Sequence, residues 1–295
     1  MLNWKRFGAA AFARAHIVIA SILASTLCCG PSFAGSIQQP GLMAGLPEGW
    51  APEPGLYGVM AFNSGADEKF NSTVGVPAFL NFSTPLEVAG ARVQFKTVPL
   101  VVANVNMQGL HRIGTYNSYV GSWFSWFLGH GFNVAIGEGA WISTGSPLTR
   151  ALGTDFTAFQ QNLAITYLRD NWNITLNSFY ATGHTNPFAS SPQTLNFDLT
   201  AIKRDGRAEW GFIAFSEVDL DKPSVGYMNR QSSVALGALY GYLIGNQISA
   251  QIKLSHTFYA KNTARDTRLG IQFIIPIYTP AAPAPSNAAE ALAAR

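Results

Sequence analysis

Apolar and polar residues alternate along most of this chain, most regularly near its C-terminal end. Between Ile248 and Phe258, the even positions are mainly apolar and the odd positions are polar. A second alternating run extends from Leu269 to Ile277. Side chains on a strand point to opposite faces with period two. The two runs therefore predict two β-strands, each with one apolar face and one largely polar face.

The same alternation predicts about twelve strands in all, joined by connections that alternate in length. The expected ranges are 55–63, 74–82, 89–105, 116–128, 131–142, 155–168, 172–180, 194–203, 208–218, 231–244, 246–258 and 266–278. Asp205-Gly206 and Gly245-Asn246 mark tight hairpin turns. Longer connections, such as residues 181–193, separate the hairpins. An even number of strands with this alternation is typical of bacterial outer-membrane barrels.

The expected fold is all-β: a transmembrane, antiparallel up-and-down β-barrel of about 12 strands, with short periplasmic turns and longer extracellular loops. Every backbone group in hydrocarbon must be hydrogen-bonded, and strands achieve this only in a closed barrel. In such a barrel the apolar faces contact lipid and the polar faces line the lumen. We therefore expect Ile252, Leu254, Ile271 and Phe273 to face lipid, and Gln251, Lys253, Arg268 and Gln272 to line the lumen.

Two places depart from the regular pattern. Glu138 shares a face with the apolar residues of its predicted strand, and a charge that faces lipid is unfavourable. We expect a bulge or a glycine kink at Gly137 or Gly139 to turn Glu138 inward. Pro77 and Pro99 lie within predicted strands, where each removes a hydrogen-bond donor, so these strands are expected to be bent or partly unpaired.

Aromatic residues cluster at the predicted strand ends, as in the two girdles of a membrane barrel. Residues expected in the periplasmic girdle are Trp126, Phe127, Phe132, Trp172, Trp210 and Tyr278. Residues expected in the opposite girdle are Tyr116, Trp141, Phe156, Tyr180 and Phe258.

The first 34 residues are expected to form a secretory signal that is cleaved after export through the inner membrane. Lys5, Arg6 and Arg14 give a basic leader, and Ile17–Leu27 is an apolar run. This run has about eleven residues, whereas a membrane-spanning helix needs roughly 20. Ser32-Phe33-Ala34 fits a small-residue cleavage site. An exported chain of alternating strands is expected in the cell outer membrane.

The charge balance changes once this signal is removed. The full chain has 19 basic and 16 acidic residues, and three of the basic residues lie in the signal. The mature chain is therefore close to neutral, which argues against nucleic acid as a partner. Charged residues form 12% of the chain, about half the roughly 25% of soluble domains. Because Cys28 and Cys29 both lie in the signal, no disulfide or cysteine–metal site is expected after cleavage.

The remaining chain is expected to contain one domain between two segments without strand periodicity. Residues 35–54 are rich in proline and glycine and are expected to form a flexible lead-in. Residues 55–278 form the predicted barrel, and residues 279–295 form a Pro/Ala-rich tail. Outer-membrane lipid and the barrel-assembly machinery are the expected partners of such a domain.

Two stretches resemble a known family: Gly139-Ala140-Trp141-Ile142-Ser143-Thr144-Gly145, and the run from Gln161 to Asn171. They are similar to outer-membrane barrels associated with the meta-cleavage pathway of phenol degradation, often called MetA-pathway or SphA-like transporters. The resemblance extends from about Pro54 to Tyr278. The family usually has Pro-Thr-Gly where this chain has Ser143-Thr144-Gly145, and this chain lacks the family's Gly-Asp step before the fourth strand. The resemblance implies passage of small hydrophobic or aromatic solutes as the function.

Six charged residues are predicted to face the lumen and to line a permeation path: Arg92, Lys96, Asp198, Glu217, Lys253 and Arg268. In a closed barrel the four basic residues are expected to share one wall, with the two acidic residues across the lumen. Such an arrangement would orient polar or anionic solutes. The alternative is that these charges pair with one another and fill the lumen, because barrels of this size have limited interior space.

Two other classes of function compete with a passive channel. An outer-membrane enzyme needs a nucleophile and a base within hydrogen-bonding reach, but Ser255 and His256 are adjacent on a strand and face opposite ways. His184 lies in a long loop, and no metal-ligand cluster or cofactor motif is evident, so no catalytic residue, metal or cofactor is expected. A structural or adhesive barrel would act through its loops, which carry apolar residues such as Phe188 and Tyr227.

Overall fold

The computed structural model describes residues 37–280, except 68–69, 108–109, 186–189, 222–228 and 246. The predicted signal lies outside the described residues, as do the loop residues Phe188 and Tyr227 and nearly all of the predicted C-terminal tail. Within the described ranges, no helix is long and apolar enough to cross a membrane.

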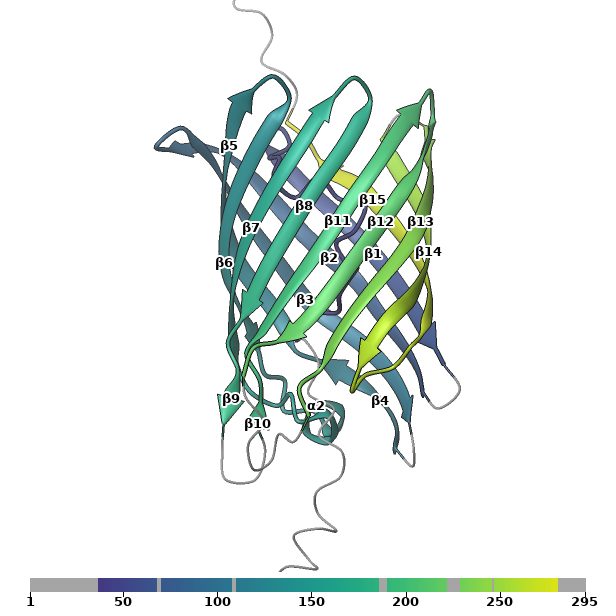
Figure 1. Ribbon diagram of the computed structural model, residues 1–295. Helices are drawn as coiled ribbons and strands as arrows, with labels where there is room; N and C mark the ends of the chain where they lie inside the picture. The colour runs from purple at the N-terminus through teal and green to yellow at the C-terminus, as the bar shows by residue number, and fades with distance from the viewer. Residues whose placement is uncertain are drawn as a thin grey trace, which may run out of the picture.

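The wall of the molecule is a closed antiparallel barrel of 12 strands (Figure 1). Its strands are β1 (Gly55–Ala66), β2 (Phe70–Val88), β3 (Ala91–Met107), β5 (Ser118–Gly129), β6 (Phe132–Ile142), β7 (Ala158–Arg169), β8 (Trp172–Ala181), β11 (Thr194–Asp205), β12 (Ala208–Asp219), β13 (Ser232–Ile244), β14 (Ile248–Lys261) and β15 (Thr267–Tyr278). Neighbours in this series pair with one another, and β1 pairs with β15 to complete the ring. The predicted fold class is therefore confirmed, and every predicted strand has its counterpart.

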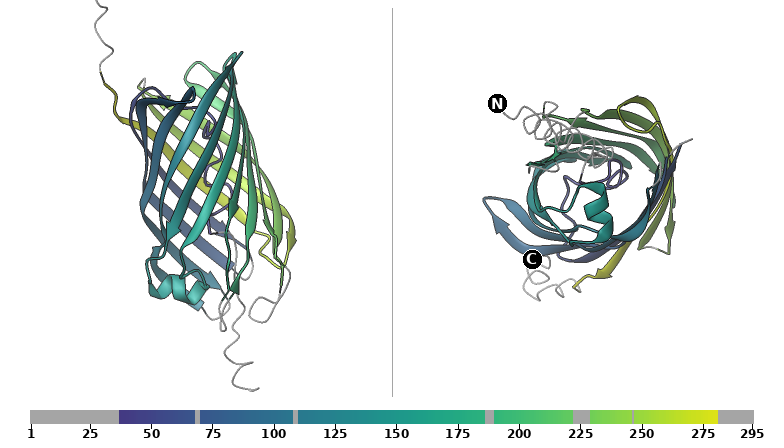
Figure 2. Two further views of the ribbon diagram at one scale, coloured as in Figure 1. Left: turned by 90° about the vertical axis from the view of Figure 1, so that its left-hand side faces the viewer. Right: turned by 90° about the horizontal axis from the view of Figure 1, so that it is seen from below.

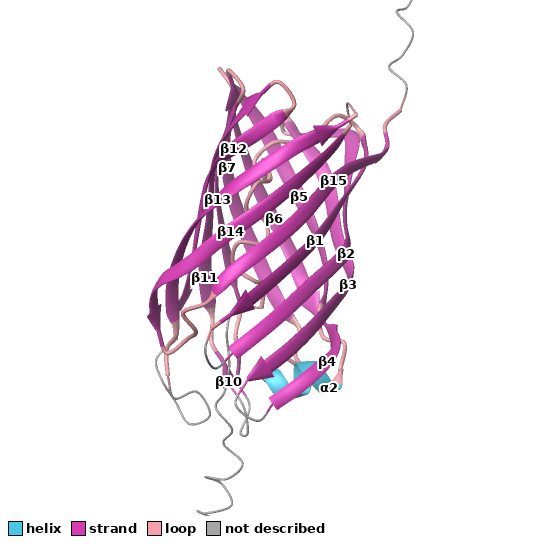
Figure 3. Cartoon of the chain, turned by 90° about the vertical axis from the view of Figure 1, so that its right-hand side faces the viewer, coloured by secondary structure: helices cyan, strands magenta, loops and turns pink. Residues whose placement is uncertain are grey.

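Short turns gather at one end of the barrel and long connections at the other (Figures 1 and 3). The short turns use residues in the left-handed backbone region, including His130, Asp170 and Gly206. Asparagine, aspartate and glycine tolerate this conformation better than other residues, which explains their frequency in these turns. By the usual topology of such barrels, the short-turn end is periplasmic.

The long-connection end contains four small elements that strand periodicity did not predict. Strand β4 (Leu110–Tyr116) extends the sheet beyond β3, and β9 (His184–Thr185) pairs with β10 (Ser190–Ser191). Helix α2 (Pro147–Leu152) is capped by Ser146, whose side chain accepts a hydrogen bond from the Thr149 N–H. Viewed from this end, α2 projects inside the ring of strands (Figure 2).

The predicted orientation of side chains is confirmed for β14 and β15: apolar side chains face outward and polar side chains face the lumen. On β14, Leu254 is 58% exposed on the outer surface, whereas its neighbour Lys253 is 3% exposed and faces the lumen. Ile252 and Ile271 are also exposed, Phe273 is half-buried, and Gln251 and Gln272 are buried inside. Arg268 is half-buried and reaches into the lumen. The apolar faces therefore contact lipid, since burial runs opposite to that of a soluble protein.

The prediction that Glu138 turns inward is wrong. Strand β6 pairs with β7 in continuous register through Glu138, and this side chain is exposed on the outer surface. The neighbouring glycines serve a different purpose. A Cβ atom at Gly137 would lie 2.5 Å from the ring of Trp123, and one at Gly139 would lie 2.5 Å from the hydroxyl of Tyr119. They make room for two rings inside the barrel and do not kink the strand.

Strands β2 and β3 are irregular where the two prolines occur, as expected. The register between them shifts between Gly75 and Ala78 and again between Ala78 and Leu80. Pro77 lies in this region of β2, and Pro99 lies opposite it on β3. Because proline has no N–H group, each removes one ladder hydrogen bond.

Only one of the two aromatic girdles has the predicted form. At the short-turn end, Phe127, Phe132, Trp172, Trp210 and Tyr278 are all exposed on the outer surface. At the other end, Phe258 is exposed, but Trp141 and Phe156 are buried inside the barrel, and Tyr116 packs against their cluster. The predicted second girdle is therefore wrong for these three residues, which line the lumen.

Candidate functional site

Residues 37–54 run through the lumen along the length of the barrel, and we call this segment the plug (Figures 1 and 2). Ile37 lies near Phe156 at the long-connection end, and Glu53 reaches Arg92 at the other end. The plug is built from successive turns, such as the hydrogen bond from the Leu46 N–H to the Met43 carbonyl. The sequence predicted a flexible lead-in here. The structure instead buries most of these residues against the wall.

Three glycines tie the plug to the wall at intervals of four residues. The N–H groups of Gly41, Gly45 and Gly49 donate to side-chain oxygens of Asp198, Thr200 and Thr166, at 2.9, 2.8 and 2.9 Å respectively. A Cβ atom at each glycine would lie within 3 Å of wall atoms. In the sequence these glycines form the pattern Gly-x-x-x-Gly-x-x-x-Gly. The pattern alone does not indicate which residues of the wall they contact.

Lys253 and Asp198 bind the same turn of the plug from two different strands. The Lys253 ammonium donates to the carbonyl oxygens of Gly41, Leu42 and Ala44 at 3.1, 3.3 and 3.1 Å. The Asp198 carboxylate accepts the Gly41 N–H. Lys253, the cation, therefore binds peptide carbonyl oxygens, and Asp198, the anion, binds a peptide N–H. Each charge interacts with the end of the peptide dipole that has the opposite sign.

Lys96 and Glu48 form a buried ion pair between the wall and the plug. The Lys96 Nζ lies 2.6 Å from the Glu48 Oε2, and each side chain is 4% exposed. The same ammonium lies 3.6 Å from the ring centroid of Trp123, a cation–π contact. Removing either partner would leave a buried charge without compensation, which is strongly unfavourable.

All six charged residues predicted to face the lumen do so, and five of them contact the plug. Besides the three already described, Arg268 donates to the Pro40 carbonyl and Arg92 donates to the Pro52 carbonyl, both at 3.1 Å. Glu217 lines a cavity beside the plug. The structure therefore brings these residues to the plug, where the sequence hypothesis expected opposed walls. Their part in permeation stays a prediction.

Several cavities lie along the plug. The outer cavity, at the long-connection end, has a volume of about 210 Å³ and is lined by apolar residues of β2, β3 and β4, with Glu217, Asp266 and Arg268 on its other side. The inner cavity is smaller, about 30 Å³, and shares Leu42, Val76 and Trp141 with the outer cavity. A third cavity of about 220 Å³, the exit cavity, lies at the short-turn end. The plug contributes residues to all three, so it divides the lumen into compartments.

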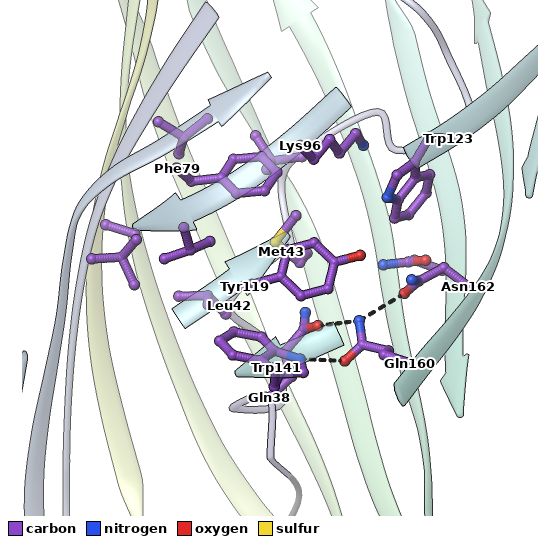
Figure 4. Close-up of a pocket in the computed structure, with 16 residues that line it drawn as sticks. Gln38, Leu42, Met43, Phe79, Lys96, Tyr119, Trp123, Trp141, Gln160 and Asn162 are labelled. Carbon is purple, nitrogen blue, oxygen red and sulfur yellow. Dashed lines mark hydrogen bonds between the residues drawn. The ribbon is translucent and has the colours of Figure 1, made fainter. Parts of the chain in front are cut away.

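An amide network lies at the edge of the inner cavity nearest the outer cavity, in the lower part of Figure 4. The indole N–H of Trp141 donates to the Gln160 Oε1 at 2.7 Å. The Gln160 amide then donates to Gln38 on the plug at 2.8 Å and to Asn162 on its own strand at 3.0 Å. Side chains from β6, β7 and the plug are therefore connected at the point where the outer and inner cavities meet.

The two histidines that were considered for an enzymatic site contact a threonine and an aromatic ring. His256 is exposed on the outer face and contacts Thr267, whereas its neighbour Ser255 is buried inside, so the two do not meet. His184 stacks on the ring of Phe156 at a centroid distance of 5.2 Å. Within the described ranges, no group of three histidine, cysteine or acidic residues could hold a metal ion.

Comparisons with known proteins point in one direction. The family model described as "Putative MetA-pathway of phenol degradation" matches residues 57–273. An outer-membrane channel from Pseudomonas putida F1 is similar in structure, with a TM-score of 0.64 and 13% sequence identity over 81% of this chain and 99% of that chain. At this identity the likeness shows a shared fold.

Two more distant structures are also similar. The NanC porin has a TM-score of 0.48 and 8% identity, over 75% of this chain and 100% of that chain. The β-domain of the Bordetella autotransporter BrkA has a TM-score of 0.46 and 11% identity, over 77% of this chain and 100% of that chain. No curated protein matches the chain significantly.

Proposed function

Since this chain belongs to the MetA-pathway family of phenol degradation, we propose that it is an outer-membrane channel for the passive passage of small apolar or aromatic solutes, with the plug as its gate. The residues proposed to line the path are the six luminal charges, the apolar walls of the outer and inner cavities, and the more polar wall of the exit cavity. The mature chain is proposed to reside in the outer membrane after cleavage of its signal. Its proposed partners are membrane lipid, the solute and the barrel-assembly machinery.

The apolar outer cavity is the observation that carries this proposal. Val74, Val101, Ala103 and Val105 turn inward to line it, and they continue the apolar inner face that Val76 and Val98 form on the same strands. A dry apolar cavity on the order of 150 Å³ is enough to bind benzene in another protein. The outer cavity, about 210 Å³, therefore suits a small aromatic molecule.

Passage requires the plug to move, because the inner cavity is too small for such a solute. The described contacts between plug and wall are hydrogen bonds, one buried and one exposed ion pair, and apolar packing. The plug carries no strand within its residues 37–54, so its release breaks no sheet ladder. Opening can therefore occur while the barrel stays intact.

The occluded lumen also favours a second candidate, a structural barrel that conducts nothing. A barrel with a filled interior can serve a structural role without conducting solutes, and the plug fills much of this lumen. The proposed channel differs because it needs an apolar cavity that solute can enter. Solute uptake therefore separates the two candidates, and it also separates the channel from an enzyme acting at the rim.

The test measures uptake of a small neutral aromatic solute by cells of a diderm host that lacks its general porins. We expect the wild-type protein to raise the initial uptake rate above that of cells with an empty vector. Ala103→Phe fills the outer cavity and should return uptake to the vector level. Val102→Phe is the matched control, because Val102 precedes Ala103 on β3 and lies on the other face. Uptake by wild-type cells no faster than the vector would exclude the channel.

A further inference from the structure

Four buried polar atoms in the inner cavity make no hydrogen bond of acceptable geometry among the described residues, although the Tyr119 hydroxyl lies close to the Trp123 and Asn162 side chains. They are the Tyr119 hydroxyl, the Trp123 indole nitrogen, the Asn162 amide nitrogen and the Asn177 amide oxygen. Their side chains are between 2% and 5% exposed. More than nine in ten buried polar groups in proteins have a partner, so four exceptions in one place require an explanation.

These four side chains converge on one side of the inner cavity. Tyr119 and Trp123 come from β5, Asn162 from β7 and Asn177 from β8, and all four line the cavity. The Tyr119 hydroxyl points toward Asn162 and lies beside Trp123 (Figure 4). The wall is built to hold them, because the Cβ atoms missing at Gly137 and Gly139 would collide with Trp123 and Tyr119.

The opposite side of the inner cavity is apolar. It is formed by Leu42 and Leu46 of the plug together with Val59, Val76 and Phe79 of the wall. A molecule that satisfies both sides has an apolar body and one polar end. The polar end must accept hydrogen bonds from two of the three donors at Tyr119, Trp123 and Asn162, and donate one to the Asn177 oxygen. A hydroxyl group does both.

The charges nearby favour an uncharged ligand. Lys96 lies over Trp123, but its charge is matched by Glu48 at 2.6 Å. A carboxylate or other anion at the polar end would have to compete with Glu48 for this ammonium. An alcohol leaves the ion pair intact and requires no desolvation of a full charge.

We propose that Tyr119, Trp123, Asn162 and Asn177 form a hydroxyl subsite that selects small uncharged aromatic or alicyclic alcohols within the channel. This inference rests on the proposed function, since it names the class of solute that the channel admits. In the occluded state the inner cavity of about 30 Å³ holds roughly two waters, each needing at least about 10–15 Å³. The solute hydroxyl replaces one water, and its body takes the space of Leu42 and Leu46 as the plug withdraws.

The test compares benzyl alcohol with toluene, which differ by the hydroxyl group. Binding to the purified full-length protein is measured by calorimetry at one fixed detergent concentration. We expect benzyl alcohol to bind more tightly than toluene. Tyr119→Phe and Asn162→Leu should each lower this preference by about threefold to tenfold, the range of one net hydrogen bond of roughly 0.5–1.5 kcal/mol. Benzoate should bind more weakly than benzyl alcohol.

Gln161→Leu is the matched control for Asn162→Leu. It makes the same kind of change one residue away on β7, but Gln161 is exposed on the outer face. The preference should stay at the wild-type value in this control. Heat-modifiable electrophoretic mobility reports whether each variant forms a folded barrel, and Tyr119→Phe, which removes one oxygen, guards against misfolding of Asn162→Leu.

Two outcomes would overturn the subsite. Equal binding of the two ligands to the wild type, or an unchanged preference in both folded variants, would mean that the four polar atoms bind only water. Either result leaves the uptake test of the channel unaffected. Conversely, wild-type uptake at the vector level together with a hydroxyl preference that both variants reduce would exclude the channel and retain the subsite.

Discussion

The Lys96 ammonium lies 2.6 Å from the Glu48 carboxylate, and this pair joins the barrel wall to the plug where both side chains are buried. Each charge is compensated only while the plug is docked. The pair therefore contributes to occlusion of the lumen as well as to local packing, which makes it the most direct place to test the gate.

Glu48→Gln should release the plug. The substitution leaves the Lys96 charge buried without its partner, at a cost of about 3–5 kcal/mol, which lowers the ratio of docked to released plug by at least about a hundredfold. Mean single-channel conductance in planar bilayers should rise. Glu53→Gln is the control, because Glu53 is 83% exposed and its pairing with Arg92 is loose. A conductance equal to the wild type in Glu48→Gln would show that the ion pair does not hold the plug.

Gly45→Val should displace the middle of the plug. A Cβ atom at this position would lie 2.5 Å from the Gln251 amide oxygen, and its φ of +99° disfavours any branched side chain. With a single cysteine introduced at the buried Ala44, labelling by a membrane-impermeant maleimide should become faster. Gly129→Val is the matched control, since φ is +88° there but nothing lies within 4 Å. Equal labelling rates in Gly45→Val and in the control would contradict the prediction.

Lys253→Met should make the lumen more selective for cations. It removes the ammonium that binds three plug carbonyls and leaves the Asp198 carboxylate without this neighbour. The reversal potential in a salt gradient should shift in the direction of cation permeation. Lys203→Met removes the same charge from the exposed short-turn end of β11, where Lys203 lies over the Trp172 ring, and should shift the potential little. A shift of equal size in both variants would contradict a luminal role for Lys253.

Glu138→Leu should stabilise the barrel in a membrane. This carboxylate faces outward from a lipid-facing strand, and its removal should raise the free energy of unfolding by about 1 kcal/mol. Urea titration in phospholipid vesicles measures the change. Glu209→Leu is the contrasting variant, because Glu209 is buried and accepts hydrogen bonds from Ser249 and Gln251, so it should destabilise. A loss of stability in Glu138→Leu would show that this carboxylate has a partner on the outer surface.

Strand periodicity predicts the barrel well, because lipid and lumen impose opposite polarity on alternate residues. The predicted ranges for β6 and β12 differ from those in the structure by one residue at most, as residues 131–142 and 208–218 compare with Phe132–Ile142 and Ala208–Asp219. Helix α2 falls outside this signal because six residues are too few for a period. Its boundaries nevertheless have recognisable capping residues in the sequence, Ser146-Pro147 at the start and Gly153 at the end.

The candidate site is harder to predict, because the role of each of its residues depends on contacts with residues far away in the chain. Alternation alone predicts that Lys96 and Lys253 face the lumen. Their partners cannot be predicted in this way, because they lie in the plug, which has no alternation. The glycines beside Glu138 suggested a kink, but their purpose appears only beside the rings of Tyr119 and Trp123. The apolar residues Trp141 and Phe156 break the polar-inside rule: Trp141 lines the outer and inner cavities, and Phe156 belongs to the same buried cluster.

The position of the plug at the start of the chain also constrains the order of folding. Its contacts with Asp198 and Lys253 span 157 and 212 residues, so they form only when β11 and β14 have joined the sheet. Bringing together residues that are so far apart in the chain costs conformational entropy, and this cost comes before the contacts can stabilise the fold. We therefore expect the plug, which precedes the first strand, to be fixed last, so that an assembling barrel has an open lumen before the plug docks.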